Sequence, residues 1–198
     1  MTRRVVLAAL LAALAACPGG GKSPAPCPSD AAANEYSVYS AAIEEFSRGR
    51  DARTVVISDR TEDLSDPRGV TGEWVRRCEA LVPETEESMV TSFRGRNGQP
   101  LELTRSFTLR GDYVLASPAD LKSIPSDRMR LEGMGAKYPD AFGVVGLSRV
   151  GFNAGMNKAV VYISRGHCGL GCGEGACMFL VREDCEWKVK DKGGVWVS

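Results

Sequence analysis

The residues best suited to chemistry lie close together near the C-terminal end of the chain. Residues 166–175 read Gly-His-Cys-Gly-Leu-Gly-Cys-Gly-Glu-Gly and contain Cys168, Cys172 and the single histidine of the chain, His167. Cysteine and histidine are the side chains that most often form disulfides, bind metals or act as nucleophile and base. This segment is therefore the first candidate for a functional site.

Three non-catalytic chemistries suit the segment, and a disulfide between Cys168 and Cys172 is the one we predict. The surrounding glycines allow the tight turn that closes so short a loop in an oxidising compartment. A zinc site would add His167 and Cys177 to the two cysteines, but structural zinc sites use a second close pair of ligands. A redox-active pair is disfavoured because three residues, rather than two, separate the cysteines. We therefore predict no metal and no cofactor.

The catalytic alternative is a small hydrolase or transferase centred on the Ser164–Gly175 loop. His167 would act as the general base, and Glu174 would orient it. Either Cys168 or Ser164 would be the nucleophile. Neighbouring residues of an extended strand point to opposite faces, so His167 and Cys168 would diverge. We therefore predict no catalytic residue and expect a non-catalytic binding or structural module.

The N-terminal residues predict export and a lipid anchor. Two arginines precede an uncharged, Leu- and Ala-rich stretch over residues 5–16, which is shorter than the roughly 20 residues that span a bilayer. Residues 1–16 thus predict a signal peptide. Leu14-Ala15-Ala16-Cys17 is similar to a bacterial lipobox, which makes Cys17 the predicted lipid-attachment residue. The alternative is an ordinary cleavage site at which Cys17 has no role.

The cysteine count agrees with this prediction. The chain has 7 cysteines, and lipidation of Cys17 leaves an even number for disulfides. Residues 17–30 are rich in Gly, Pro and Ser and predict a lipidated flexible linker. Apart from Cys168 and Cys172, the pairing of the remaining cysteines stays open; they are Cys27, Cys78, Cys177 and Cys185.

The charge balance argues against one class of binding partner. The 25 basic and 25 acidic side chains cancel, so no basic field is present to hold a nucleic-acid backbone. We expect no nucleic-acid partner. The predicted partners are the membrane, reached through the lipid anchor, and a protein of the envelope. The predicted location is the cell envelope after export.

The hydropathy pattern predicts one domain over residues 31–198 of the α+β class, in which N-terminal helices precede an antiparallel β-meander. Helices are expected over residues 31–47, 74–81, 117–124 and, as a helix or a loop, 128–137. Strands are expected over residues 53–58, 113–115, 142–150, 159–164, 178–182 and 187–190. Asn97-Gly98 is a candidate hairpin turn between residues 89–93 and 101–109.

The last hairpin can be predicted in more detail. A turn at residues 182–185 places Leu180 opposite Trp187 on a core face. The other face would carry Cys177, together with Phe179 and Val181, as a mixed surface covered by lysine stems. Cys177 and Cys185 would then lie too far apart for a disulfide.

The C-terminal third also resembles a family of exported bacterial lipoproteins to which no activity is assigned. The resemblance lies in residues 148–153 (Ser-Arg-Val-Gly-Phe-Asn), the Cys-Gly-Leu-Gly-Cys-Gly-Glu-Gly segment at 168–175, Trp187-Lys188-Val189 and Trp196-Val197-Ser198. It implies a β-meander with loop cysteines at the positions of Cys168 and Cys172, and no catalytic residue. Cys177, Cys185 and His167 depart from the family pattern.

Overall fold

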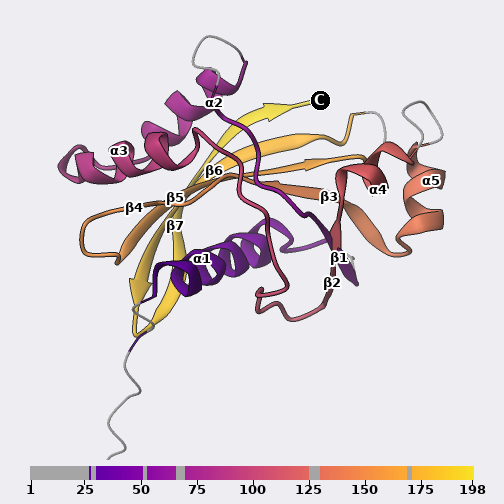
Figure 1. The fold of residues 1–198 in the computed structure, drawn as a ribbon, viewed down its shortest axis with the longest axis horizontal. Helices are drawn as coiled ribbons and strands as arrows, with labels where there is room; N and C mark the ends of the chain where they lie inside the picture. The colour runs from indigo at the N-terminus through magenta and orange to yellow at the C-terminus, as the bar shows by residue number, and fades with distance from the viewer. Residues whose placement is uncertain (1–26, 28–29, 51–52, 66–69, 125–129, 169–170) are drawn as a thin grey trace, which may run out of the picture.

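The computed structural model describes residues 27, 30–50, 53–65, 70–124, 130–168 and 171–198. One mixed seven-stranded sheet organises them, with the order β2-β1-β3-β5-β6-β7 and β4 paired with β5 (Figure 1). The strands are β1 Thr54–Ser58, β2 Asp112–Ala116, β3 Ala141–Leu147, β4 Gly151–Phe152, β5 Lys158–Gly166, β6 Glu174–Glu183 and β7 Glu186–Val197. The helical segments are α1 Ala31–Phe46, α2 Val70–Glu79, η1 Glu84–Glu86, α3 Glu87–Arg96, α4 Pro118–Lys122 and α5 Arg130–Lys137. The predicted α+β class is confirmed.

The sheet has two halves with different strand directions. β3, β5, β6 and β7 pair antiparallel and form the predicted meander. β1 pairs parallel with both β2 and β3, so the N-terminal strands extend the same sheet. Parallel neighbours need crossover connections, which here contain α2 and α3 or α4 and α5. The helices are therefore not confined to the start of the domain.

Helix α1 covers one face of the sheet. Asp30 caps its first turn by accepting a hydrogen bond from the backbone N–H of Ala32 at 3.0 Å. Its buried side chains include Val38, Tyr39 and Ile43, which pack in one core with the β5 and β6 residues on that face. The predicted start of this helix is confirmed and its predicted end is one residue too far, because Ser47 is the C-cap. A strong cap and a regular apolar stripe are both local signals.

The opposite face carries two separate helical covers. α2 and α3 pack over β5 and β6 in a core that contains Tyr162, Cys177 and Phe179. α4 and α5 pack over the other half of the sheet, against Val56 and Val144. The face of β6 that carries Cys177 was predicted to be a mixed surface, and that prediction is wrong. Both faces of β6 are buried, because α2 and α3, which lie far upstream in the sequence, cover the face that carries Cys177.

The hairpin predicted around Asn97-Gly98 is also wrong. Residues 89–93 belong to α3, in which Met89 and Phe93 lie four positions apart and are both 0% exposed. Residues 101–109 form no strand apart from one isolated bridge between Glu102 and Arg60. The short apolar run around Met89 fits a helix or a strand equally well by composition, and packing against the sheet selects the helix.

The predicted register of the last hairpin differs from the observed one by two residues. Val189, rather than Trp187, lies opposite Leu180, and the turn residues Asp184 and Cys185 both have positive φ. Two central residues with positive φ are typical of the tight turns that join two strands. The shift is even, so Leu180, Trp187 and Val189 still share the core face.

Three disulfides join the described cysteines. They are Cys27–Cys185, Cys78–Cys177 and the Cys168–Cys172 bond that the loop spacing predicted. The first two close 158 and 99 positions of sequence, respectively. They attach the start of the domain to the β6–β7 turn and α2 to the sheet.

Candidate functional site

A row of paired residues crosses the sheet between the two helical covers. Gly146 of β3 lies opposite Ser164 of β5, and Ser164 lies opposite Gly175 of β6. Gly175 in turn lies opposite Trp196 of β7. The serine is thus flanked on both neighbouring strands by residues without a side chain. This row forms the floor of the candidate site.

The carboxylate of Glu62 fills the space above Gly146. The backbone N–H of Glu62 donates to the carbonyl oxygen of Leu147 at 2.7 Å, which fixes the segment after β1 at the end of β3. Ser164 Oγ donates to Glu62 Oε1 at 3.2 Å. A Cβ atom at residue 146 would overlap both Glu62 Oε1 and Ser164 Oγ. Glycine at this position therefore makes room for the carboxylate.

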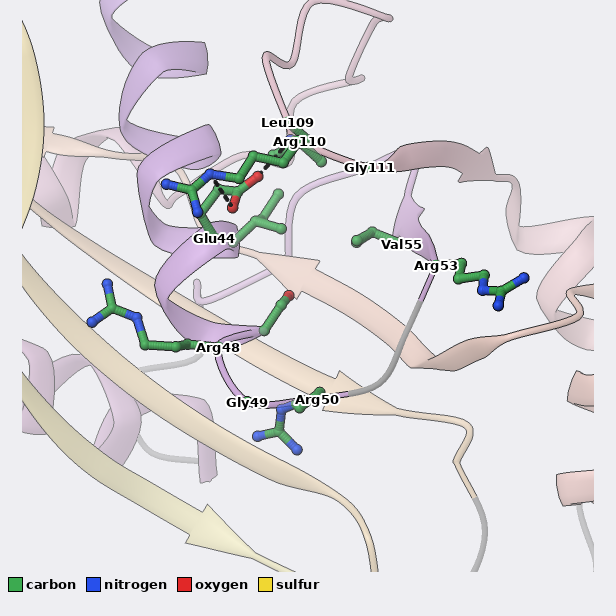
Figure 2. Close-up of a pocket in the computed structure, with 11 residues that line it drawn as sticks. Glu44, Arg48, Gly49, Arg50, Arg53, Val55, Leu109, Arg110 and Gly111 are labelled. Atoms are coloured by element: carbon green, nitrogen blue, oxygen red, sulfur yellow. Dashed lines mark hydrogen bonds and ion pairs between the residues drawn. The ribbon is translucent and has the colours of Figure 1, made fainter.

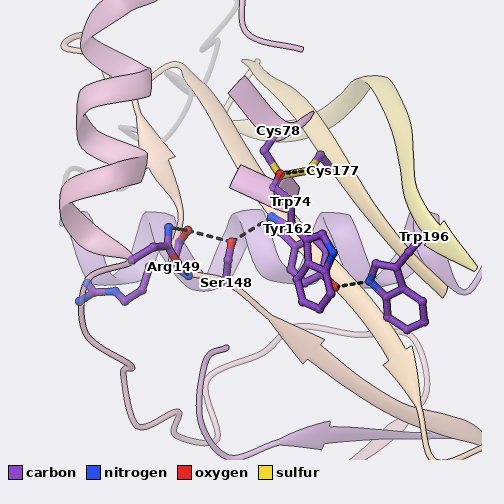
Figure 3. The surroundings of a disulfide bond; sticks show 8 residues. Trp74, Cys78, Ser148, Arg149, Tyr162, Cys177 and Trp196 are labelled. Carbon is purple, nitrogen blue, oxygen red and sulfur yellow. Dashed lines mark hydrogen bonds between the residues drawn. A yellow bond between two sulfur atoms is a disulfide. The ribbon is translucent and has the colours of Figure 1, made fainter. Parts of the chain in front are cut away.

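Three aromatic side chains occupy the other side of Ser164. Trp196 Nε1 donates to the Tyr162 hydroxyl at 2.8 Å, and Trp74 stacks on Tyr162 with ring centroids 5.2 Å apart (Figure 3). Trp74 also stacks on Trp196. The adjacent Cys78–Cys177 disulfide ties α2, which carries Trp74, to β6 (Figure 3). The aromatic cluster thereby holds the Tyr162 hydroxyl in place.

Burial governs the protonation of both acidic groups beside Ser164. It raises the pKa of Glu62 above its usual value, and the hydrogen bond from Ser164 opposes the rise. Burial also raises the pKa of Tyr162, and the nearby charge of Glu62 adds to that effect. None of the ion pairs within the described ranges includes Glu62. The carboxylate is therefore half-buried without a compensating cation from those residues.

These groups open onto a cavity of about 350 Å³. Its polar lining comes from Ser58, Glu62, Ser164, Arg165 and His167, and its apolar walls come from Leu121, Val144 and Trp196. We call it the Ser164 cavity. His167 reaches it because the chain turns with φ of 54° directly after β5. A cavity with apolar walls and a few polar groups is the usual form of a small-molecule site.

The structure separates the residues of the predicted catalytic alternative. Cys168 is bonded to Cys172, so it has no free thiol. Glu174 lies opposite Arg165, the neighbour of Ser164 in β5, and therefore on the other face of the sheet. There it pairs with Arg165 at 3.0 Å and with Arg50. Ser164 and His167 do share a cavity, but the carboxylate beside Ser164 is Glu62.

The disfavoured zinc arrangement is not assembled either. Cys177 bonds to Cys78, so it is separated from the loop cysteines, which bond to each other. Within the described ranges no group of three or more His, Cys, Asp or Glu side chains is arranged to hold a metal ion.

A second hollow, of about 320 Å³, lies at the C-terminal end of α1. Arg48, Arg50, Arg53 and Arg110 line it, which suggests an anion site. In Figure 2 the guanidinium groups of Arg48, Arg50 and Arg53 point away from one another. Arg110 contacts Glu44 at 3.7 Å, and Arg50 pairs with Glu174. The arginines thus do not converge on one ligand.

The remaining sequence predictions concern the N-terminus. Cys17 and residues 1–16 lie outside the described residues, as does most of the predicted linker. No helix in the described ranges has both the length and the apolar character needed to cross a membrane.

Sequence reasoning missed Glu62, Gly146 and Tyr162. Glu62 stands among charged and polar residues that are typical of an exposed loop, and Gly146 lies inside an apolar strand. A glycine inside a strand is a weak sign that another group approaches the backbone closely. That sign was available at Gly146, but it does not reveal which side chain approaches.

Comparisons with known proteins give no information about the family or the function of this chain. No protein-family model, no curated protein and no solved structure matches the chain.

Proposed function

We propose that the protein is exported, lipidated at Cys17 and held at the cell envelope, where its domain acts as a binding module. The observation that carries this proposal is the complete pairing of the six cysteines that the structure describes. Disulfides of this kind persist in oxidising compartments outside the cytosol. The pairing leaves Cys17 as the one cysteine available for acylation.

The Cys27–Cys185 disulfide supports a definite orientation on the membrane. Nine residues separate Cys17 from Cys27, which corresponds to at most about 34 Å when extended and about 17 Å on average. Cys27 is attached to the β6–β7 turn. In this proposal that turn is the end of the domain nearest the bilayer.

The Ser164 cavity lies toward the opposite end of the same strands. Gly175, which borders its floor, is ten positions before Cys185 in the chain, or about 33 Å along an extended strand. The cavity would thus face away from the lipid. This placement suits a module that meets a soluble ligand or an envelope protein. Membership of the resembling lipoprotein family is part of the same proposal.

The test is acylation of the natural chain. Cells fed a labelled fatty acid should incorporate it into the wild-type protein, and intact-mass analysis should show acyl groups on a chain that begins at Cys17. Cys17→Ser should abolish the label and move the protein out of the membrane fraction. Ser23→Ala, a matched control in the same segment, should leave both unchanged.

One result would contradict the proposal directly. A mature chain that begins at another residue and carries no lipid would exclude the anchor, whatever the domain binds.

A further inference from the structure

Glu35 and Glu62 are both shielded from water, and their surroundings differ in one respect. Glu35 is 3% exposed and is compensated by two guanidinium groups, those of Arg96 and Arg149. Glu62 has a hydroxyl neighbour, Ser164, and no cation among the described residues. Buried carboxylates are normally paired with a cation, because leaving the charge alone costs several kcal/mol. The missing partner at Glu62 is the first observation.

The second observation is where the uncompensated carboxylate lies. It lines the Ser164 cavity, so a ligand can reach it. Arg165 also lines the cavity, but its guanidinium pairs with Glu174 at 3.0 Å and donates to the Cys172 carbonyl at 2.6 Å, and it forms no ion pair with Glu62. A positively charged ligand group would therefore supply the cation that Glu62 lacks among the described residues.

The apolar walls define the rest of the ligand. Leu121 of α4, Val144 of β3 and the Trp196 ring line the cavity alongside the polar floor. Side chains of this kind suit a short chain of methylene groups that follows the charged head. Ser164 Oγ uses its hydrogen on Glu62 and keeps lone pairs to accept from the head group.

We infer that the Ser164 cavity binds a ligand with a primary ammonium group on a short aliphatic stem, such as a lysine side chain or an alkylamine. The ammonium occupies the position beside Glu62 that a guanidinium occupies beside Glu35. Glu62 and Ser164 contact the head group, and Leu121 and Trp196 contact the stem. This inference rests on the proposed role as a binding module and names the ligand class for it.

The test uses two probes that differ in the ammonium group alone. They are Nα-acetyl-lysine amide, which keeps its ε-ammonium group, and its neutral counterpart Nα-acetyl-norleucine amide. Each probe is titrated at neutral pH into the exported full chain carrying Cys17→Ser. Amide NMR should show shifts at Gly146, Ser164 and Gly175 with the lysine probe. The lysine probe should bind at least about tenfold more tightly than the norleucine probe, as a charged hydrogen bond predicts.

Two variants remove the charge complementarity in different ways. Glu62→Gln keeps the shape of the side chain and should weaken binding of the lysine probe about tenfold or more. Leu121→Lys supplies an ammonium from the chain itself at the cavity wall and should block the probe. Glu102→Gln is the matched control, because Glu102 is an exposed carboxylate paired with Arg60 outside the cavity, and it should bind like the wild type.

The outcomes are distinguishable from those of the lipidation test. Equal binding of the two probes, no shifts with either, or unchanged lysine binding in both Glu62→Gln and Leu121→Lys would overturn the ammonium site. The binding test uses a chain without Cys17, so a negative binding result says nothing about the lipid anchor. A negative acylation result likewise says nothing about ligand binding in the cavity. Thermal unfolding of each variant identifies any that does not fold, and the remaining variant then decides.

Discussion

Glu35 and Glu62 are both carboxylates shielded from water, but their surroundings compensate the negative charge to different extents. Glu35 accepts hydrogen bonds from the Tyr39 hydroxyl at 2.9 Å and the Val150 backbone at 3.1 Å, and it pairs with Arg96 and Arg149. Every contact is supplied by the chain. Among the described residues, Glu62 accepts a hydrogen bond from Ser164, has no cationic partner, and faces a cavity. A carboxylate paired with cations is a structural link, whereas one without a cation beside a cavity is a candidate binding group.

The Glu35 network also shows what such a link connects. It joins α1 to α3 through Arg96 and to the connection after β3 through Arg149 and Val150. Burial and the adjacent carboxylate raise the pKa of Tyr39, so its hydroxyl remains a donor. The contacts of Glu35 with Arg96, Arg149 and Val150 thus fix the position of α1 relative to segments far away in the sequence. Within the described part of the chain, Glu62 takes part in no comparable network of ion pairs.

Removal of Glu35 should have the largest effect on stability. Glu35→Ala leaves two arginines and a backbone N–H without their shared acceptor, and we expect a loss of about 3 kcal/mol in the free energy of unfolding. Urea denaturation measures it. A loss below about 1 kcal/mol, as for a typical surface pair, would break the distinction between the two carboxylates.

A methyl group at residue 146 should have the next largest effect. Gly146→Ala places a Cβ where Glu62 Oε1 and Ser164 Oγ now lie, so the carboxylate has to move. We expect a loss of about 1–3 kcal/mol from overpacking. The cost should be smaller in a Glu62→Ala background, which a double-mutant cycle measures. Strictly additive losses would show that Glu62 does not occupy that space.

Glu62→Gln should change the pH dependence of stability. The folded-state pKa of Glu62 is raised above the usual value of 4.5, so the folded state binds its proton more tightly than the unfolded state. The stability that Glu62 contributes is present below pH 4.5 and is lost as the pH rises through the folded-state pKa. The Gln variant should therefore gain stability relative to the wild type as the pH rises. Denaturation curves in acid and at neutral pH measure the gain, and a gain in the opposite direction would refute the burial of an uncompensated charge.

The smallest effect is expected at an exposed pair. Arg60 and Glu102 are 55% and 77% exposed at their side chains and 2.6 Å apart. Glu102→Gln should change the free energy of unfolding by less than about 1 kcal/mol, because solvent screens such pairs. This variant sets the baseline against which the Glu35 and Glu62 results are compared. A larger loss would mean that exposure does not explain the different contributions of Glu35, Glu62 and Glu102 to the free energy of unfolding.

The predictable parts of the fold are those with a local signal. The Asp30 cap and the apolar stripe of α1, the β-branched run of β1 and the short spacing of Cys168 and Cys172 each lie within a few residues. The register of the last hairpin failed by two residues, because nothing local distinguished a turn at Asp184 and Cys185 from one shifted by a single position.

The candidate site lacked such a signal. Ser164 and His167 stood out by residue type, but the carboxylate that contacts Ser164 comes from 102 positions upstream. In the catalytic alternative Glu174 would orient His167, its neighbour in sequence, but strand alternation places Glu174 on the other face. Proximity in sequence was therefore a poor guide to proximity in the sheet.

By itself the amino-acid sequence determined the class of the fold, its first helix and most of its strands, since periodicity reports which face of an element is apolar. Only the tertiary structure decided the partners of Cys27 and Cys78, the burial of Glu35 and the place of Glu62 above Gly146. Periodicity does not report which distant element covers an apolar face, and these features depend on that choice.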